Sequence, residues 1–499
     1  MLKKNIIANF IGNFWGSALA IIMVPYYVRL LGVESYALIA FNSTLLTLLM
    51  LLDVGLSPTL GRQVTCFCAG EGQRNDLIGL LNSLEMMFMG MSLLLVTSIW
   101  LLSDIISRHW FQANQLSVET VAFCLIWMGS MAGFRWLSTL YRGGIVGLEK
   151  QVWLNITNSL IFTLRFAGVV PVIMIWPRIE VFFVYQTVTV FLECGLLRRY
   201  LRRELKANQA VAPRFSWGIL KRHAAFSGSL AFTSLIWVLI TQSDKLVLSK
   251  IIPLREYGYF GLAVLIAGGI NVLSAPLHQA FAPRFTALAA QKDDRSLFEL
   301  YHIAMQLVGV IAVPIGLVMA IWPESVLFAW TGDRQLAASV APILTWYALG
   351  NVCLALITPC FYLQYAYGKL HLHVIGNVIF GVLLVPSIIL VAMRYGALGA
   401  AHVWFVGNLL FLLVWVPIVH SRLAPGENRR WYIEDIIFPA TAALLVGLVG
   451  NLFVTGNLTS RGSALFICVL VWAISAAFTS LASTRLIKRL PRMFAWYKA

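Results

Sequence analysis

Apolar stretches of about 20 residues recur along almost the whole of this 499-residue chain. Each is long enough to cross the hydrocarbon core of a bilayer as one helix, because an α-helix rises about 1.5 Å per residue. A soluble protein of this length would need more charge on its surface, and only 12% of these residues are charged. The sequence therefore predicts an all-α protein that crosses a membrane many times.

The apolar stretches predict about fourteen transmembrane helices. The segments between them are short, and no outer loop exceeds roughly 20 residues, so we expect no extramembrane domain. The predicted spans are about 6–29, 36–60, 78–102, 118–140, 153–176, 179–199, 219–248, 257–280, 299–322, 339–365, 371–393, 398–420, 434–455 and 464–484.

The distribution of Lys and Arg predicts the orientation. The loops and tails on the side of the N-terminus carry roughly three times as many Lys and Arg as those on the other side. Because basic segments stay in the cytoplasm, both termini are expected there. The formal charge of +16 is explained by these loops, so we expect no nucleic-acid partner.

The longest polar interruption divides the predicted spans into two lobes. We expect an N-lobe of six helices at 1–205, a basic cytoplasmic linker at 206–218 and a C-lobe of six helices at 219–420. A further helix pair with a basic cytoplasmic tail follows at 434–499. The stretches "LLGVESYALIAF" and "IIPLREYGYFGL" occupy equivalent places in the two lobes, as in transporters with duplicated halves.

One arginine, Arg165, stands near the middle of the fifth predicted span, with Asn158 two helical turns earlier on the same face. A charge at the centre of a bilayer costs about 2.5–3.5 kcal/mol even on insertion scales that give low penalties. This face should therefore contact protein or water. Arg165 is either a cation in a wet cavity or the structural partner of Glu85 or Asp53.

Two more arginines, Arg135 and Arg142, share a face of the fourth predicted span near its cytoplasmic end. They either extend toward the lipid headgroups, as long basic side chains do, or form a positive track that leads to Arg165. The second interpretation makes all three arginines candidate substrate-binding residues.

The candidate coupling or ion-pair carboxylates are Glu85, Asp53 and Asp244. Each could pair with an arginine, carry a coupling proton or do both, although Asp244 also suits an interfacial position. The polar residues that accompany them on the same helix faces are further cavity candidates: Asn82, Ser234 and Thr241. The histidines at 278, 302 and 402 are expected to be hydrogen-bonded helix residues and not ligands or proton carriers.

Motifs for catalysis are missing from the sequence. It has no Walker loop, no GxSxG and no HExxH, and its CxC pair at Cys66 and Cys68 has no partner ligands nearby in the sequence. We therefore expect neither an enzyme nor a bound metal or other cofactor.

Three features together resemble one family. They are the opening "NIIANFIGNFWGSALAIIMVPYYVRLLGVESYALIAF" with the following "LLDVGLSPTLGRQV", the stretch "ITQSDKLVLSKIIPLREYGYFGLAVLI", and the six-plus-six plan. The chain is similar over residues 1–420 to the Wzx-type polysaccharide flippases of the multidrug/oligosaccharidyl-lipid/polysaccharide (MOP) exporter superfamily. The final helix pair is similar instead to the fourteen-helix plan of other members, including lipid II flippases.

The resemblance implies a function in surface polysaccharide or O-antigen synthesis. An undecaprenyl-pyrophosphate-linked oligosaccharide would pass from the cytoplasmic to the periplasmic leaflet of the bacterial inner membrane, with two lobes that open alternately. Arg165 and Arg135 best match the cavity cations of this family. The implied partners are this lipid-linked oligosaccharide and bilayer lipid, with polysaccharide polymerase and chain-length components as further candidates.

Two other functions are compatible with a polytopic chain. A multidrug or cation antiporter of the same fold should have an acidic and aromatic cavity, whereas arginines match the acids in number in the first lobe here. A polysaccharide polymerase or ligase should carry a sizeable outer loop, and the outer loops here are short.

Overall fold

The computed structural model describes residues 2–49, 56–68, 70, 73–206, 238–453 and 460–483. These residues are almost entirely helical, and the described part of the chain contains no β-strand beyond a single bridge between Gln112 and Pro253. Eleven of the described helical stretches are long and apolar enough to cross a membrane. The predicted all-α polytopic fold class is confirmed.

The difference between eleven stretches and fourteen predicted spans has three sources. The spans 371–393 and 398–420 lie in one stretch, Leu370–Leu423, which bends at Gly396. The span 36–60 corresponds to a shorter helix, Val33–Leu49, and to the start of the next one. Most of the span 219–248 lies outside the described residues.

The chain forms two compact units, Met1–Gly258 and Tyr259–Ala499. This division falls some 40 residues after the predicted linker at 206–218, most of which lies outside the described residues, and the two six-helix lobes remain a prediction. The first unit is a bundle whose elements are α1 (Leu2–Leu31), α2 (Val33–Leu49), α3 (Leu56–Cys68), α4 (Arg74–His109), α5 (Val118–Gly147), α6 (Gln151–Phe162), η2 (Thr163–Ala167), α7 (Val169–Ile175), α8 (Ile179–Glu204) and a further helical segment at 238–251.

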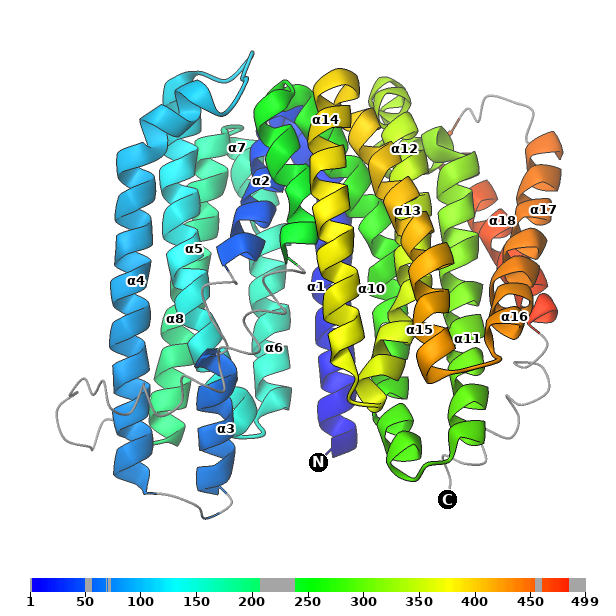
Figure 1. The fold of residues 1–499 in the computed structure, drawn as a ribbon. Coiled ribbons are helices and arrows are strands. Elements are labelled where there is room, and N and C mark those ends of the chain that lie inside the picture. Colours follow the sequence, from blue (N-terminus) through cyan, green and yellow to red (C-terminus); the bar gives the residue numbers. More distant parts are fainter. Residues whose placement is uncertain are drawn as a thin grey trace. The chain divides into compact units, whose positions relative to one another are not determined.

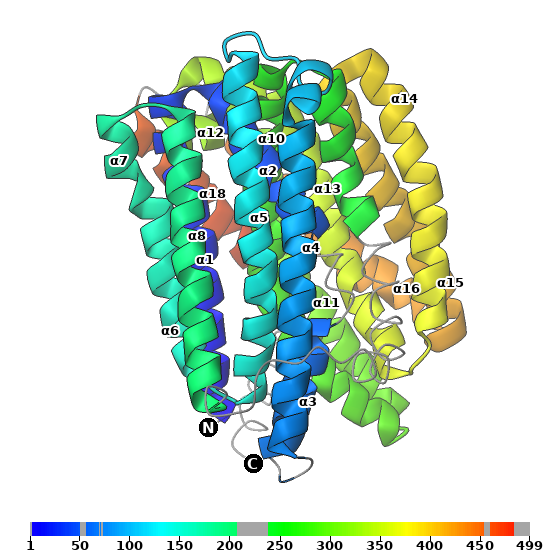
Figure 2. The same ribbon diagram turned by 90° about the vertical axis from the view of Figure 1, so that its left-hand side faces the viewer.

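Helix α5 is the central element of the first unit. It lies between α4 and α8 and also packs on α3, and the views in Figures 1 and 2 show the three long helices side by side. The ring of Trp136 on α5 stacks on Phe88 of α4 with centroids 4.6 Å apart. Buried Leu140 of α5 and Leu197 of α8 belong to the same apolar cluster. This core fixes the polar face of α5 against α8.

Glycines bring α3 and α5 into close backbone contact. A Cβ atom at Gly61 would lie 2.7 Å from the carbonyl oxygen of Gly143, and one at Gly143 would overlap the carbonyl oxygen of Ser57. Thr65 of α3 donates to the carbonyl of Gly147 at 3.1 Å. The crossing therefore depends on residues without side chains, as is common between membrane helices.

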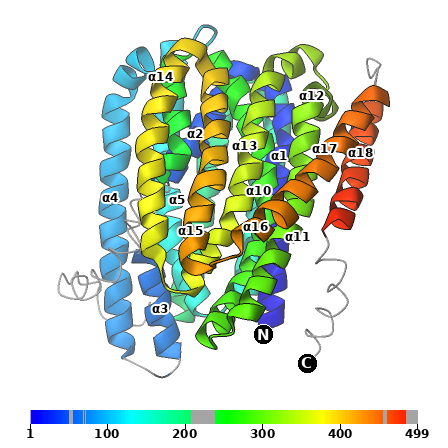
Figure 3. The same cartoon turned by 45° about the vertical axis from the view of Figure 1, so that its right-hand side comes forward.

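The second unit contains most of α10 (Leu254–Ala290) and all the later helices. These are α11 (Asp294–Ile321), α12 (Pro323–Thr331), α13 (Arg334–Ala366), α14 (Leu370–Leu410), η4 (Phe411–Trp415), α15 (Val416–Leu423), α16 (Asn428–Arg430), η5 (Trp431–Ile437), α17 (Phe438–Phe453) and α18 (Arg461–Ala482). Gly396 divides α14 with φ 58° and ψ −144°, a conformation that glycine alone adopts readily. The last two helices, α17 and α18, lie side by side and both pack on α11 (Figure 3).

Candidate functional site

Arg165 lies on η2, a π-helical turn between α6 and α7. The amide of Gly168 donates to the carbonyl of Thr163, five residues earlier, at 3.0 Å. Such turns widen a helix and are frequent at functional sites. They also take carbonyl groups out of the normal helical hydrogen-bonding register, so other donors must satisfy them.

Side chains from α1 and α8 satisfy the carbonyls of this turn. Three donors each bind one carbonyl: the Tyr185 hydroxyl binds that of Leu164 at 2.9 Å, Gln186 Nε2 binds that of Arg165 at 2.8 Å, and the Tyr27 hydroxyl binds that of Phe166 at 2.6 Å. The π-helical turn is therefore supported by the surrounding helices.

The guanidinium of Arg165 is buried, since the residue is only 5% exposed. Its Nε donates to Gln186 Oε1 at 3.0 Å, and its Cζ lies 5.6 Å from the ring centroid of Phe166. Its Nη1 is buried and has no hydrogen-bond partner among the described residues. A buried cation with an unused donor is costly, and it is well suited to bind an anion.

Arg135 and Arg142 of α5 both pair with Glu193 of α8. Arg135 Nη1 lies 3.4 Å from Glu193 Oε1, and Arg142 Nη2 makes a closer contact with the same oxygen. Arg142 also donates from Nη1 to Asn158 Oδ1 at 2.6 Å. Both arginine side chains are partly exposed, whereas that of Glu193 is only 1% exposed.

Arg165 interacts electrostatically with both arginines of α5 and with Glu193. We call Arg135, Arg142, Arg165 and Glu193 the arginine cluster. It contains three cations and one anion, so two positive charges are in excess. Repulsion among the arginines adds to the desolvation of Arg165, and an incoming anion would relieve both.

The three predicted cations thus lie in one cluster, and Asn158 contacts it by accepting a hydrogen bond from Arg142. Glu193 and Gln186 were not predicted as site residues from the sequence. A sequence signal was available, because Glu193 is a single carboxylate in the apolar stretch "VTVFLECGLL" and follows Gln186 by seven residues. That spacing places both residues on one helix face.

Glu85 forms a separate network and is not the partner of Arg165. It binds Arg198 at 2.8 Å and Arg202 at 2.5 Å, and it accepts from the Tyr141 hydroxyl at 2.7 Å. Arg202 also donates to Asn82 at 3.2 Å. The alternative that pairs Arg165 with Glu85 is therefore wrong, because the end of α8 supplies two arginines to Glu85.

The remaining candidates lie elsewhere or outside the described residues. Asp53 and Ser234 are not among the described residues. Asp244 is fully buried, and its carboxylate lies 3.1 Å from Lys245 Nζ, which also donates to the carbonyl of Thr241 at 2.6 Å. Asp244 is thus buried within the first unit, and its interfacial position in the membrane stays a prediction.

Comparisons with known proteins identify the family of the chain. A family model described as "Polysaccharide biosynthesis protein" matches residues 2–289, more than half of the chain. A Shigella flexneri protein named "Putative O-antigen transporter" is 23% identical over 441 residues, which cover 83% of this chain and 97% of that protein.

Solved structures share the fold. The lipid II flippase MurJ in an inward closed conformation matches with a TM-score of 0.68 at 15% identity, over 96% of this chain and 99% of its own. An inward-facing MATE family multidrug transporter of the MOP superfamily matches with a TM-score of 0.69 at 13% identity, over 82% and 94%. All of these proteins are described as transporters or flippases, and none as an enzyme.

Proposed function

Since the chain belongs to the polysaccharide biosynthesis protein family, we propose that it is a flippase for polyprenyl-pyrophosphate-linked oligosaccharides. Its substrate would be an undecaprenyl-linked repeat unit of O-antigen or a related surface polysaccharide. The substrate would pass from the cytoplasmic to the periplasmic leaflet of the bacterial inner membrane, with both termini of the protein in the cytoplasm. The relative named as an O-antigen transporter supports this substrate class.

The observation that carries the proposal is the excess of positive charge in the arginine cluster, with Arg165 buried at its centre of repulsion. A pyrophosphate carries about two negative charges and presents oxygens that suit the planar, bidentate donors of arginine. Arg165 has a donor nitrogen, Nη1, that makes no hydrogen bond with any described residue. The cluster would thus replace part of the hydration that the pyrophosphate loses in the membrane, while the polyprenyl tail stays in the lipid.

Glu193 would hold the two partly exposed arginines before the substrate binds. Its carboxylate contacts both Arg135 and Arg142. The phosphate oxygens would then compete with a protein carboxylate for the same donors, which keeps the bound state from becoming too stable. Release into the opposite leaflet requires such weak net binding, and alternating access of the two lobes would expose the cluster to each side in turn.

The same charge argues against a multidrug function. Cationic drugs need acidic or aromatic cavity walls, whereas three arginines meet one carboxylate in this cluster. The shared MATE fold carries no substrate information at 13% identity.

A deletion strain tests the proposal. Without the chain, lipid-linked repeat units should accumulate at the cytoplasmic face, and no unit should reach periplasmic acceptors until the chain is restored. If single units still reached the outside and only their polymerisation stopped, the chain would be a polymerase. If surface polysaccharide were unchanged and sensitivity to cationic drugs rose, it would be a drug exporter.

A further inference from the structure

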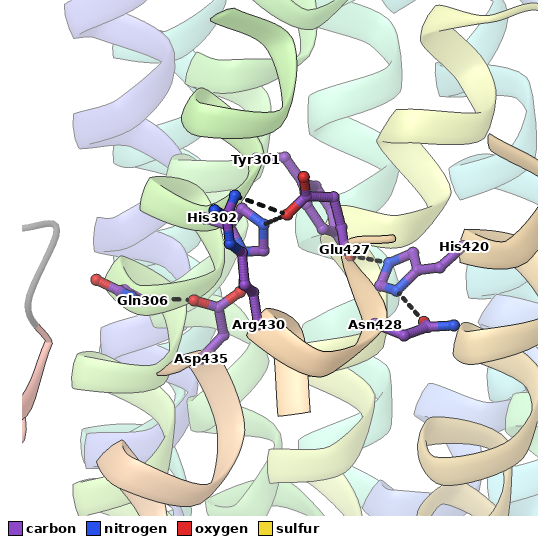
Figure 4. A network of polar contacts seen from close by, with 8 residues as sticks. All are labelled: Tyr301, His302, Gln306, His420, Glu427, Asn428, Arg430 and Asp435. Atoms are coloured by element: carbon purple, nitrogen blue, oxygen red, sulfur yellow. Dashed lines mark hydrogen bonds and ion pairs between the residues drawn. The ribbon is translucent and has the colours of Figure 1, made fainter. Parts of the chain in front are cut away.

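A second buried charged group, distinct from the arginine cluster, lies inside the second unit. His302 and Gln306 come from α11, Glu427 immediately precedes α16, and Asp435 lies on η5 (Figure 4). His302 and Gln306 are fully buried, and Asp435 is 1% exposed. Like Arg165, Asp435 lies on a π-helical turn, the element type that often marks functional sites.

Both ring nitrogens of His302 face carboxylate oxygens. Nδ1 is in close contact with Asp435 Oδ2, and Nε2 lies 3.1 Å from Glu427 Oε2. Gln306 Nε2 donates to the other oxygen of Asp435 at 3.0 Å. The His302 ring therefore connects a carboxylate on η5 to a carboxylate at the start of α16.

The number of protons in this group follows from hydrogen-bond chemistry. A neutral imidazole has one N–H donor and one acceptor nitrogen, and an ionised carboxylate can only accept. Two ionised carboxylates and a neutral imidazole would leave one carboxylate oxygen against the lone pair of a ring nitrogen. The contacts are satisfied only if one more proton is present, either on the imidazole or on a carboxyl group.

The neighbouring His420 shows the opposite case. Its Nε2 lies 2.8 Å from the Tyr301 hydroxyl, and its Nδ1 lies 3.1 Å from Asn428 Oδ1. The hydroxyl can donate and the amide oxygen can accept, so the neutral imidazole satisfies both contacts. His302 and His420 thus lie in the same region of the second unit, but only His302 requires an additional proton.

The group reaches the surface of the second unit. The side chains of His302 and Asp435 are completely buried, whereas that of Glu427 is 17% exposed. Arg430, whose side chain is 58% exposed, lies 3.5 Å from Glu427. Exposure therefore increases from Asp435 through His302 and Glu427 to Arg430.

Titratable groups near the site among the described residues include Tyr301 and Cys360, and His420 interacts electrostatically with both His302 and Glu427. Tyr301 of α11 interacts with Asp435, and Cys360 belongs to α13. Arg430 supplies a positive charge next to Glu427, at the exposed end of the site.

We propose that Asp435, His302 and Glu427 form a proton-binding site. The bound proton would hold η5, and the helices α17 and α18 that follow it, against α11. A proton would leave His302 Nε2 for the Glu427 carboxylate and pass from there to water as hydronium, and the reverse sequence would load the site. Loss of the proton places a carboxylate oxygen against a ring lone pair at a buried contact. The segment Trp431–Ile437 should then separate from α11 more often. This revises the expectation that His302 is only a hydrogen-bonded helix residue.

Two isosteric substitutions remove the need for the additional proton. In Asp435→Asn, the new amide can donate to Nδ1 while the neutral ring donates to Glu427. In Glu427→Gln, the new amide can donate to Nε2 while the ring donates to Asp435. His420→Gln is the matched control, since it removes a buried histidine next to the site whose contacts need no additional proton.

The experiment measures hydrogen exchange of amides 428–437 in the purified full-length protein between about pH 5 and about pH 9, corrected for the intrinsic exchange rate. Protection in the wild type should be highest at low pH, because the docked state holds the additional proton. Above the pH at which the proton is lost, the equilibrium constant for opening of this segment should increase by up to about tenfold per pH unit. Asp435→Asn and Glu427→Gln should abolish this dependence, and His420→Gln should keep it.

Two results would overturn the proposal. The first is a wild-type protein whose corrected protection is independent of pH. The second is a pH dependence that persists in either isosteric variant. If Asp435→Asn does not fold, Glu427→Gln decides alone, because Glu427 lies at the exposed end of the site. The measurement needs no transport substrate, so its outcome is independent of the proposed flippase function.

Discussion

Replacing Arg165 by alanine should remove most transport from the protein that remains in the membrane. The substitution deletes the buried guanidinium whose Nη1 makes no hydrogen bond with a described residue. One charge-assisted contact is worth about 1.5–3 kcal/mol, which corresponds to a loss of roughly ten- to a hundredfold. Arg165→Lys keeps the charge but loses the planar fork, so it should retain part of the activity. Arg165→Glu should be the most damaging, because it repels the phosphates.

The assay is the amount of surface polysaccharide per molecule of membrane-inserted protein in a deletion strain. This normalisation is essential because Arg165 also has a structural role, through the hydrogen bonds that it exchanges with Gln186. Gln186→Ala provides the control. It removes both of these hydrogen bonds but leaves the cation in place, so it should lower abundance and largely preserve export per molecule.

The two explanations of Arg165 therefore predict different patterns. If Arg165 contacts the substrate, the alanine variants at 165 and 186 should differ strongly in export per molecule. If Arg165 only supports η2, both should lose abundance to a similar extent and export normally per molecule. Near-normal export per molecule by Arg165→Ala would refute the substrate contact.

Three further predictions concern folding and topology. Glu85→Gln should lower the free energy of unfolding by about 1–3 kcal/mol, because it weakens charged hydrogen bonds to two arginines. The expected result is reduced abundance with unchanged export per molecule. Lost coupling at normal abundance would instead make Glu85 a proton carrier. Gly143→Val should prevent insertion or folding because its side chain would overlap a backbone carbonyl of α3, whereas Gly90→Ala, with open space around it, should be tolerated, as membrane abundance will show. Reporter fusions after residues 210 and 425 should both report the cytoplasm, and a periplasmic signal at either position would contradict the predicted six-plus-six division.

The fold class could be predicted because one physical requirement dominates it. A helix must be apolar over about 20 residues to cross a bilayer, and this pattern is local in sequence. The predicted boundaries were less accurate where the pattern is continuous. At Gly396 the chain bends within a single apolar stretch, and hydropathy alone does not report a backbone angle.

The candidate site was predictable in its cations but not in its pairings. Arg165 was identifiable because a charge inside an apolar stretch is costly and therefore conspicuous. Its partners were not, because the sequence offered Glu85 or Asp53, whereas the guanidinium binds Gln186 and interacts electrostatically with Glu193. The choice depends on how α8 is rotated against α4 and α5, which places Glu193 at the arginines of α5 and turns Arg198 toward Glu85.

The π-helical turns explain why both buried charged groups were only partly predicted. Helical-face arguments assume about 3.6 residues per turn, and a π-helical turn adds a residue and rotates everything that follows it. Arg165 lies on η2 and Asp435 on η5, where regular helical spacing no longer fixes the direction of a side chain. Side chains far away in the sequence bind the carbonyls of π-helical turns. In the first unit, the Tyr27 hydroxyl donates to the carbonyl of Phe166 in η2. In the second unit, the Tyr432 hydroxyl of η5 donates to the carbonyl of Leu413 in η4. A charged residue in an apolar helix can therefore be found from sequence, whereas its direction depends on which distant donors stabilise a wider turn.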